Sequence, residues 1–373
     1  MTKRYKGDPL IPAVTIFLSL FGIVMIYSAS SYGAELAYGD AFFYVKKQAV
    51  SFAAGLVLMF GIGFFDLKFL VKLRYVILVV SLILLALVFV PGLSFSNYGA
   101  TRWINLGFTT LQPSEISKFG FIIYAAAEMS VHDMNKFKNT LPVFGAGGAM
   151  CALIMLEPNM SVTMCVGLVM IVMLFIGGMK LKTMLLLLLP IAAGAVLLIV
   201  LEPYRMSRLI AFIDPWASPK AEGYQLIQSY YALGSGGFFG VGLFNSRQKY
   251  LFLPFSESDF IFSIVGEELG LFGSLFTAAL FVVLVLRITK SARTADCKFG
   301  AYLAAGIASL IAVQTAINIA VVSGSIPPTG LPLPFMSAGG SSLSAYMAAA
   351  GLAMNVSARK NPLAVFGNGT KSF

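Results

Sequence analysis

The sequence predicts an all-α polytopic membrane protein with ten transmembrane helices, both termini in the cytoplasm, and a long extracytoplasmic loop between helices 7 and 8. Of its 373 residues, 58% are hydrophobic and only 11% are charged, whereas about 25% of the residues in a soluble domain are charged. Apolar runs long enough to cross a bilayer recur along the chain. The cations gather in alternate loops, so the net charge of +10 indicates topology rather than nucleic-acid binding.

The apolar runs define the spans in chain order. The first covers residues 9–28 and follows a basic N-terminus. It is longer than the apolar segment of a cleaved signal peptide, which has about 7–15 residues, so we expect an uncleaved helix. The other spans are expected near residues 45–65, 72–91, 113–130, 141–157, 160–178, 181–201, 259–287, 299–323 and 334–357.

The charges set the orientation of these spans. The loops that we place inside hold seventeen cations, whereas the short outward loops hold only Lys46, Lys47 and Arg102. Only an even number of spans produces this asymmetry, so both termini are expected in the cytoplasm. We expect one transmembrane domain over residues 1–358, with an extracytoplasmic loop at about 202–258, and a short cytoplasmic tail over 359–373. The seventeen inward cations are Lys3, Arg4, Lys6, Lys68, Lys72, Arg74, Lys136, Lys138, Lys180, Lys182, Arg287, Lys290, Arg293, Lys298, Arg359, Lys360 and Lys371.

The long outward loop is unusual in its composition. Its prolines and glycines predict turns and short helices, and its aromatic residues are typical of segments that lie in the membrane interface. Long loops escape the positive-inside bias, so cations are permitted there. Five cations beside an outer leaflet nevertheless favour an anionic ligand, and they are Arg205, Arg208, Lys220, Arg247 and Lys249.

Asp259 follows this loop, where the eighth span begins. A carboxylate at a membrane edge is costly and is therefore a candidate for function. The alternative is a helix cap, because an acid at a helix N-terminus is favoured by the helix dipole and Ser258 could also cap. Against that alternative, Glu257 could serve equally well as a first-turn acid, and the basic loop converges on Asp259. We interpret Asp259 as a general base.

Two further groups of acidic residues lie within predicted spans. Glu267 and Glu268 could line a polar cavity, but partners for cations on neighbouring helices are the more common case. Glu115 and Lys118 are three residues apart and can pair on one helix face. That pair could be structural or could line a substrate groove, and the spacing alone favours the structural alternative.

Two outward loops offer ligand contacts. Arg102 is either an interfacial anchor or a pyrophosphate ligand. The last outward loop is rich in proline and small residues, and such backbone occurs at membrane depth only where it lines a cavity or is buried in protein. Its N–H groups could approach a phosphate, or its small residues could allow tight helix packing. The candidates in it are Ser337, Gly339, Gly340, Ser341 and Ser342.

Several motifs in order resemble one family, the shape, elongation, division and sporulation (SEDS) proteins, whose branches are represented by RodA, FtsW and SpoVE. The resemblance covers the chain from about residue 9 to residue 355. The residues that carry it are Ala100-Thr101-Arg102-Trp103-Ile104, Gln112-Pro113-Ser114-Glu115 with Lys118, Tyr204-Arg205 with Arg208, Asp214-Pro215-Trp216, Gln225, Gln228, Gly236-Gly237, Ser246-Arg247-Gln248-Lys249, Leu253-Pro254, Asp259-Phe260-Ile261-Phe262, Glu267-Glu268-Leu269-Gly270, Gln314 with Asn318, and residues 330–342.

The resemblance implies ten helices, an extracytoplasmic cavity, and polymerisation of lipid II into glycan strands in the bacterial cytoplasmic membrane. It implies a class B penicillin-binding protein (a transpeptidase) and other division or elongation proteins as partners. Asp259 matches the essential aspartate of the family, and Gln248 and Lys249 match a motif that we assign to substrate binding together with Arg205 and Arg208. Residues 27–30, 43–48 and 205–216 are closer to the FtsW and SpoVE branch, although residues 331–334 are nearer RodA.

The sequence departs from the family pattern in three places. Glu157-Pro158-Asn159 stands where Gln-Pro-Asp is usual, Ala338 stands for Tyr, and Ser258 stands for Thr. No cofactor is specified, and the cysteines show no metal or disulfide spacing. A divalent cation, Mg²⁺ or Mn²⁺, remains an alternative to Arg and Lys as the counter-charge for pyrophosphate.

Two other functions fit a polytopic protein of this kind. A lipid II flippase or transporter would also need a polar cavity and broken helices, but it usually shows internal repeats and a site at mid-membrane. We find no repeat, and the polar residues gather on one side. A non-catalytic division scaffold would predict that Asp259 is dispensable.

Overall fold

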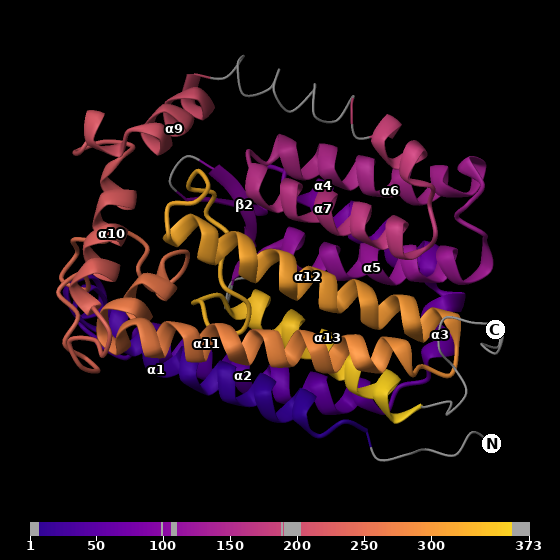
Figure 1. Cartoon of the computed structure of the whole chain (residues 1–373), viewed down its shortest axis with the longest axis horizontal. Coiled ribbons are helices and arrows are strands. Elements are labelled where there is room, and N and C mark those ends of the chain that lie inside the picture. The colour runs from indigo at the N-terminus through magenta and orange to yellow at the C-terminus, as the bar shows by residue number, and fades with distance from the viewer. Residues whose placement is uncertain (1–6, 98–99, 106–109, 188, 190–202, 360–373) are drawn as a thin grey trace.

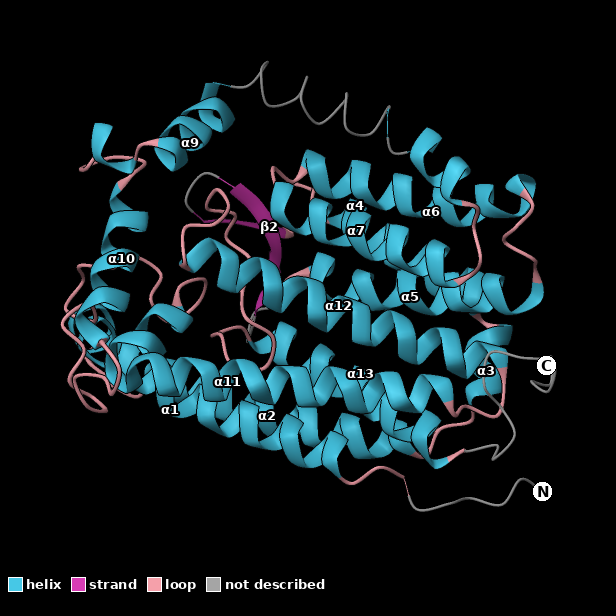
Figure 2. Cartoon of the chain, viewed as in Figure 1, coloured by secondary structure: helices cyan, strands magenta, loops and turns pink. Residues whose placement is uncertain are grey.

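The computed structural model describes residues 7–97, 100–105, 110–187, 189 and 203–359. Its long helices run side by side along the longest axis of the molecule, with α9 and α10 at one end (Figure 1). The described residues are mostly helical, with three short strands beside the bundle (Figure 2). The helices are α1 (Leu10–Tyr38), α2 (Phe43–Gly63), α3 (Leu67–Lys72), α4 (Arg74–Leu87), α5 (Pro113–Val131), α6 (Phe137–Leu156), α7 (Met160–Ile176), α9 (Pro203–Ile213), α10 (Tyr224–Gly236), α11 (Ile261–Arg293), α12 (Lys298–Val322) and α13 (Gly340–Ala358), with a 3₁₀ turn at Pro215–Ala217.

The helical, multi-span character predicted from the sequence is confirmed. Five of the described helices, α1, α2, α6, α11 and α12, are long and apolar enough to cross a bilayer, and α4 and α7 are apolar but shorter. The ten-span count stays a prediction. Its seventh span, 181–201, lies largely outside the described residues, of which 181–187 are helical.

The bounds of several spans differ from those predicted. The span expected at 72–91 corresponds to α4, which is shorter and follows the separate short helix α3. The span expected at 334–357 begins only at Gly340, because Pro334 cannot continue a helical hydrogen-bond ladder and Gly339 has extended backbone. The first span continues to Tyr38 and ends at Gly39, whose φ of 68° closes the helix in the left-handed region.

The all-α prediction is wrong in the loop after α4, which was predicted to face outward. A three-stranded antiparallel sheet, in the order β1-β2-β3, follows α4 and comprises β1 (Ser94–Asn97), β2 (Ala100–Asn105) and β3 (Thr110–Leu111). Phe95 pairs with Trp103, and Ile104 pairs with Leu111. Strand pairing satisfies the backbone groups of this connection. The strands are too short for an alternating pattern to show them in the sequence.

The last helix packs into the first hairpin. Small residues allow this approach, because a Cβ on Gly351 would overlap the main chain of Met59 and one on Gly55 would overlap the side chain of Met347. The N–H of Asp8 donates to the hydroxyl of Ser357 at 2.9 Å, so α1 begins where α13 ends. Both ends of the described chain therefore lie at one end of the bundle (Figure 1).

Helix α11 is interrupted at Gly270, whose backbone (φ 66°, ψ −163°) is not helical. The segment after α10 fills the interruption. The N–H of Leu271 donates to the carbonyl of Gly237, and the N–H groups of Val241 and Gly242 donate to the carbonyls of Glu267 and Glu268. This exchange satisfies backbone groups that an interrupted helix would leave unpaired.

The carboxylates of Glu267 and Glu268 complete that connection. Glu267 accepts from the hydroxyl of Ser246 at 2.5 Å and from the N–H of Arg247 at 2.9 Å. Glu268 accepts from the N–H of Ser246 at 3.1 Å and from the hydroxyl of Ser28 at 2.5 Å. The expected cation partners are not the ones found, because serine hydroxyls and main-chain N–H groups bind these two buried carboxylates instead. They hold the 237–258 segment against α11.

Two glycines of α10 test this docking. A Cβ on Gly236 would overlap the carbonyl oxygen of Gly266, whereas one on Gly234 meets nothing within 4 Å. We expect Gly236→Ala to destabilise the protein by about 1–3 kcal/mol through overpacking and Gly234→Ala to be neutral or stabilising by up to about 1 kcal/mol. Thermal unfolding of the purified variants measures both, and equal melting temperatures would contradict the packing described here.

Candidate active site

Asp259 lies in the turn that precedes α11, but it does not cap that helix. The N-cap position is Phe260, and α11 receives no side-chain cap hydrogen bond. The carboxylate instead faces the loop between α12 and α13, because a Cβ on Gly330 would lie 3.1 Å from Oδ2 of Asp259. The side chain is half-buried. The geometry therefore favours a functional carboxylate over a helix cap.

Polar contacts fix the chain around Asp259. Nδ2 of Asn318 donates to the Asp259 carbonyl at 2.8 Å and to the Leu331 carbonyl at 2.6 Å. The hydroxyl of Ser337 donates to the Ser258 carbonyl at 2.6 Å, and the N–H of Ala338 donates to the Glu257 carbonyl at 2.9 Å. The 257–259 segment is thereby bound to both ends of the 330–339 loop, and the carboxylate is held in place by its own backbone.

Burial sets the electrostatics of Asp259. The pKa of this carboxyl is raised to about 6: burial is the largest cause and neighbouring Glu257 adds to it, whereas Arg102 and Arg208 lower it. Burial also raises the pKa of Glu257. A carboxylate with a pKa close to neutrality is a better general base than an ordinary aspartate, and it is still mostly ionised at pH 7.

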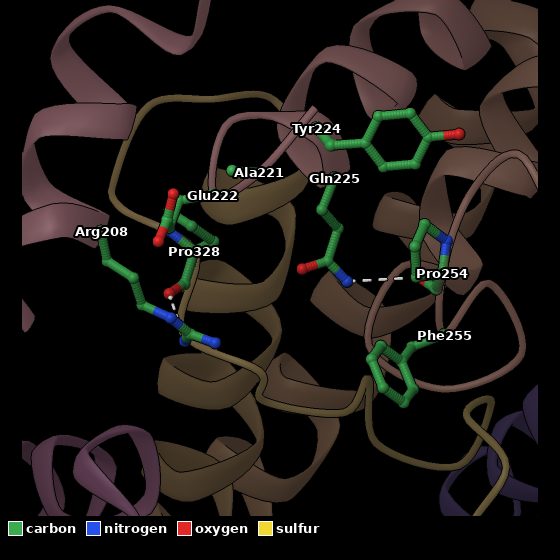
Figure 3. Close-up of a pocket in the computed structure, with 8 residues that line it drawn as sticks. All are labelled: Arg208, Ala221, Glu222, Tyr224, Gln225, Pro254, Phe255 and Pro328. Carbon is green, nitrogen blue, oxygen red and sulfur yellow. Dashed lines mark hydrogen bonds between the residues drawn. The ribbon is translucent and has the colours of Figure 1, made fainter. Parts of the chain in front are cut away.

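A pocket of about 330 Å³ lies beside this turn (Figure 3). Arg208 and Glu222 lie on one wall, and Gln225, Pro254 and Phe255 lie on the other (Figure 3). Two hydrogen bonds connect the walls to neighbouring loops. Nη1 of Arg208 donates to the Pro328 carbonyl at 3.2 Å, and Nε2 of Gln225 donates to the Pro254 carbonyl at 3.2 Å. The other lining residues are Ala221 and Tyr224.

Asp259 does not line this pocket, but two lining residues relate the pocket to it. Pro328 is two residues before Gly330, which faces the carboxylate, and Arg208 acts on that carboxylate electrostatically. A ligand in the pocket would meet one cation, one acid and two amide or carbonyl groups. Such a mixture suits a polar, uncharged group such as a sugar next to an anionic one.

Arg102 is the second cation near Asp259. It extends from β2, and Nε donates to the carbonyl of Glu157 at 3.3 Å while Nη2 donates to the carbonyl of Pro158. The guanidinium thus joins the sheet to the turn between α6 and α7. Its charge also lowers the pKa of Asp259, so the sheet and the turn between α6 and α7 hold a cation that acts on this carboxylate.

The predicted pair of Glu115 and Lys118 is present and fully buried, with 2.7 Å between Nζ and Oε1. Lys118 also donates to Oε1 of Gln314 at 2.8 Å, and Tyr346 donates to the same oxygen at 2.5 Å. The hydroxyl of Ser342 donates to Oε2 of Glu115 at 2.7 Å. Both charges are therefore satisfied by α5, α12 and α13.

Gln314 carries this buried network to the site. Its Nε2 donates to the Pro332 carbonyl at 2.8 Å, in the same loop that faces Asp259. The pair of Glu115 and Lys118 therefore supports the loop between α12 and α13 through Gln314. Gln314 lies one helical turn before Asn318 on α12. A role for Glu115 and Lys118 in substrate binding stays a prediction.

The other predicted residues fall into two groups. Those between α12 and α13 and at the start of α13 make internal contacts. The N–H of Gly339 donates to Oε1 of Gln48 at 3.1 Å, and Oγ of Ser341 accepts from the N–H of Gln112 at 3.4 Å. A Cβ on Gly340 would lie 2.6 Å from the hydroxyl of Ser51. These contacts hold the start of α13 next to α2 and to the start of α5.

The second group lies apart from Asp259. The amine of Lys249 binds the Phe244 carbonyl, and Gln248 is buried. Their segment packs on α1, where the rings of Tyr32 and Tyr250 lie 4.9 Å apart. No contact among the described residues joins Gln248 or Lys249 to Asp259. Arg205 lies in α9, but its side chain is outside the described residues.

Three amides were missing from the predicted site. Asn318, Gln48 and Gln225 each bind a backbone carbonyl of a loop at the site. For Asn318 and Gln48 the signal in the sequence was the cost of a polar amide within an apolar span. Gln225 lies in the long polar loop and gave no such signal. No group of three or more His, Cys, Asp or Glu side chains in the described parts of the chain is placed to hold a metal ion.

Comparisons with known proteins agree on one family. The sequence model of the cell cycle proteins FtsW, RodA and SpoVE matches residues 8–362. Stage V sporulation protein E of Bacillus subtilis is 38% identical over 360 residues, which cover 95% of this chain and 98% of that protein. The probable peptidoglycan glycosyltransferase FtsW of Geobacter sp. strain M18 is also 38% identical, over 96% of this chain and 98% of that protein.

Solved structures show the same fold. A chain from a structure of a peptidoglycan synthase complex, described for its coordination of polymerization and crosslinking, superposes with a TM-score of 0.79 at 26% identity and covers 94% of this chain. That match spans 97% of the other chain. The rod shape determining protein RodA of Thermus thermophilus, in a mutant form, superposes with a TM-score of 0.70 at 25% identity and equal coverage.

The buried pair allows a double-mutant test. Lys118→Met leaves the Glu115 carboxylate buried without its cation, and Glu115→Gln leaves the Lys118 ammonium without its anion; each should cost about 3–5 kcal/mol. The combined variant should lose much less than the sum, as read from the melting temperature in detergent. The exposed pair of Asp40 and Lys46 is the control, with a coupling of about 0–1 kcal/mol. Additive losses at Glu115 and Lys118 would contradict this account.

Proposed function

Because the chain belongs to the FtsW, RodA and SpoVE family of cell cycle proteins, we propose that it is a peptidoglycan glycosyltransferase that polymerises lipid II. Its similarity to SpoVE and FtsW favours a role in cell division or sporulation, with elongation as the alternative. The observation that carries the proposal is Asp259, a half-buried carboxylate with a pKa of about 6, beside a pocket and within the field of two arginines.

The chemistry needs one base and positive charge. In lipid II polymerisation the 4-hydroxyl of an acceptor GlcNAc attacks the anomeric carbon of a MurNAc that is linked to undecaprenyl pyrophosphate. Asp259 takes the hydroxyl proton as the new C–O bond forms. The pyrophosphate leaves with the electron pair of the broken bond, so the α linkage becomes β in one inverting displacement. The leaving group is a weak base and needs no acid, unlike the leaving group of an inverting glycosidase.

Arg102 and Arg208 supply the charge in this proposal. Both lie close enough to lower the pKa of Asp259, so both can stabilise the negative charge that develops on the departing pyrophosphate. Arg208 also lines the pocket and is held at the Pro328 carbonyl. A cation pre-positioned in this way costs little reorganisation during the reaction.

The topology fits an outward-facing site. We propose ten spans with both termini in the cytoplasm, one domain over residues 1–358, and an extracytoplasmic loop over about 202–258. The close contact of Asp8 with Ser357 supports termini on one side, and the excess of cations near that end supports the cytoplasmic side. The lipid tails of the substrate would then remain in the outer leaflet of the cytoplasmic membrane.

We propose a class B penicillin-binding protein as the partner, and other division or elongation proteins beside it. The support is the likeness to a chain of a peptidoglycan synthase complex that couples polymerization with crosslinking. Two other functions, a lipid II flippase and a non-catalytic scaffold, make different predictions about Asp259, because neither needs a base at that position.

Asp259→Asn is the decisive variant. It keeps the shape of the side chain and removes the base, so polymerisation of labelled lipid II should fall by at least about 100-fold, with normal expression and normal melting temperature. In the unmodified protein the rate should fall about tenfold per pH unit below about pH 6, because a base must be unprotonated to act. A near-normal rate for purified Asp259→Asn protein would exclude Asp259 as the base and favour the scaffold or the flippase.

The orientation has an independent test. Single cysteines placed at Lys220, Lys136 and Arg293, all exposed, are treated with an impermeant thiol reagent added outside intact cells. The cysteine at 220 should react, and those at 136 and 293 should react only after the membrane is opened. The native cysteines are buried or partly buried, so background labelling should be low. Labelling of all three from outside would contradict the ten-span topology.

A further inference from the structure

Glu157 is a buried acid without a hydrogen bond. It is the residue that follows α6, in the turn to α7, and its exposed fraction is 0%. Neither of its carboxyl oxygens has a hydrogen-bond partner among the described residues. A buried carboxylate in that condition is among the most costly states a side chain can adopt. The acid is therefore stable here only while it is protonated and neutral.

One charged residue faces this acid. Arg102 of β2 donates to the main-chain carbonyls of Glu157 and Pro158 in the same turn. It makes no hydrogen bond with the carboxyl group of Glu157. Among the described residues, the other charge that acts on Arg102 is that of Asp259. The first turn of α7, the last turn of α4 and residues 323–339 have no ionisable residue, Cys165 lies in the second turn of α7, and the charges of Glu115 and Lys118 on α5 are paired with each other.

The neutral form has a clear electrostatic basis. Burial raises the pKa of Glu157 to about 8, with Arg102 acting in the opposite direction. A protonated glutamic acid has the shape of glutamine and a similar set of polar atoms, and glutamine is the residue that the family pattern places here. At neutral pH this chain therefore presents a glutamine-like side chain, and it can lose a proton in mildly alkaline solution.

We propose that Glu157 is a positioning residue that acts through Arg102 and makes the reaction sensitive to alkaline pH. While Glu157 is neutral, the guanidinium stays on the two carbonyls of the turn, within the field of Asp259. When Glu157 ionises, its proton goes to solvent and its carboxylate attracts the guanidinium of Arg102. The positive charge is then neutralised locally, and less of it acts on the departing pyrophosphate. This inference rests on the proposed function.

The test is a pH–rate profile of lipid II polymerisation by the full-length purified protein and by Glu157→Gln. The rate of the unmodified protein should fall at both ends of the pH range. It falls below about pH 6 because Asp259 becomes protonated, and above about pH 8 because Glu157 becomes ionised. At pH 9 about one chain in ten keeps Glu157 neutral, so its rate should be about tenfold below the maximum. Glu157→Gln should keep the acid limb and lose the alkaline one.

Glu35→Gln is the matched control. It removes one carboxylate from an exposed position of α1, so both limbs should remain. A purely structural role for Glu157 would lower the rate of Glu157→Gln by the same factor at every pH. Either that result, or an alkaline limb unchanged in Glu157→Gln, would overturn the inference.

A second measurement separates this inference from the proposed function. Infrared difference spectra of the unmodified protein and Glu157→Gln report the carbonyl stretch of a protonated carboxyl group, without any need for activity. We expect that band at pH 7 and its loss between about pH 7 and pH 9. If no variant polymerises lipid II but the band titrates, the proposed function fails and the protonation of Glu157 stands. If the band is absent at pH 7, the inference fails whatever the activity.

Discussion

The need to satisfy backbone groups at membrane depth determines much of this structure. The loop between α12 and α13 is not helical, so its carbonyls require donors from elsewhere in the protein. Amide side chains supply them: Asn318 binds Leu331, Gln314 binds Pro332 and Gln48 binds Ser337. Because the same loop is bound to residues 257–258, the position of Asp259 depends on amides from α2 and α12.

The interruption of α11 shows the same constraint with a different solution. There the backbone of the segment after α10 pairs with the interrupted helix, and two glutamates accept from Ser246 and Arg247. Buried carboxylates serve here as hydrogen-bond acceptors for a loop. The site therefore lies between two non-helical segments, each bound to helices on either side, and these bonds add to the packing of buried apolar residues such as Leu331 and Leu333.

The sequence was informative wherever the physical signal is local. Charge asymmetry and the length of the apolar runs predicted a multi-span helical protein. Spacing predicted the pairing of Glu115 with Lys118, and the energetic cost of a carboxylate at a membrane edge identified Asp259 as a candidate. It was silent where partners are distant. Asn318 is 59 residues from the Asp259 carbonyl that it binds. The small sheet and the break at Gly270 also depend on segments that no local pattern relates to them.

The contact between the first hairpin and the last helix has a consequence for biosynthesis. The surface of α2 that surrounds Gly55 and Met59 fits the methionine and glycine residues of α13, yet more than 270 residues are made between the two helices. During synthesis α2 is therefore made long before α13, the helix that covers this surface. Intermediates with unpaired helix faces are prone to misassembly. A chain that ends before α13 would be released in that state, which makes the C-terminal helix the step that closes the fold.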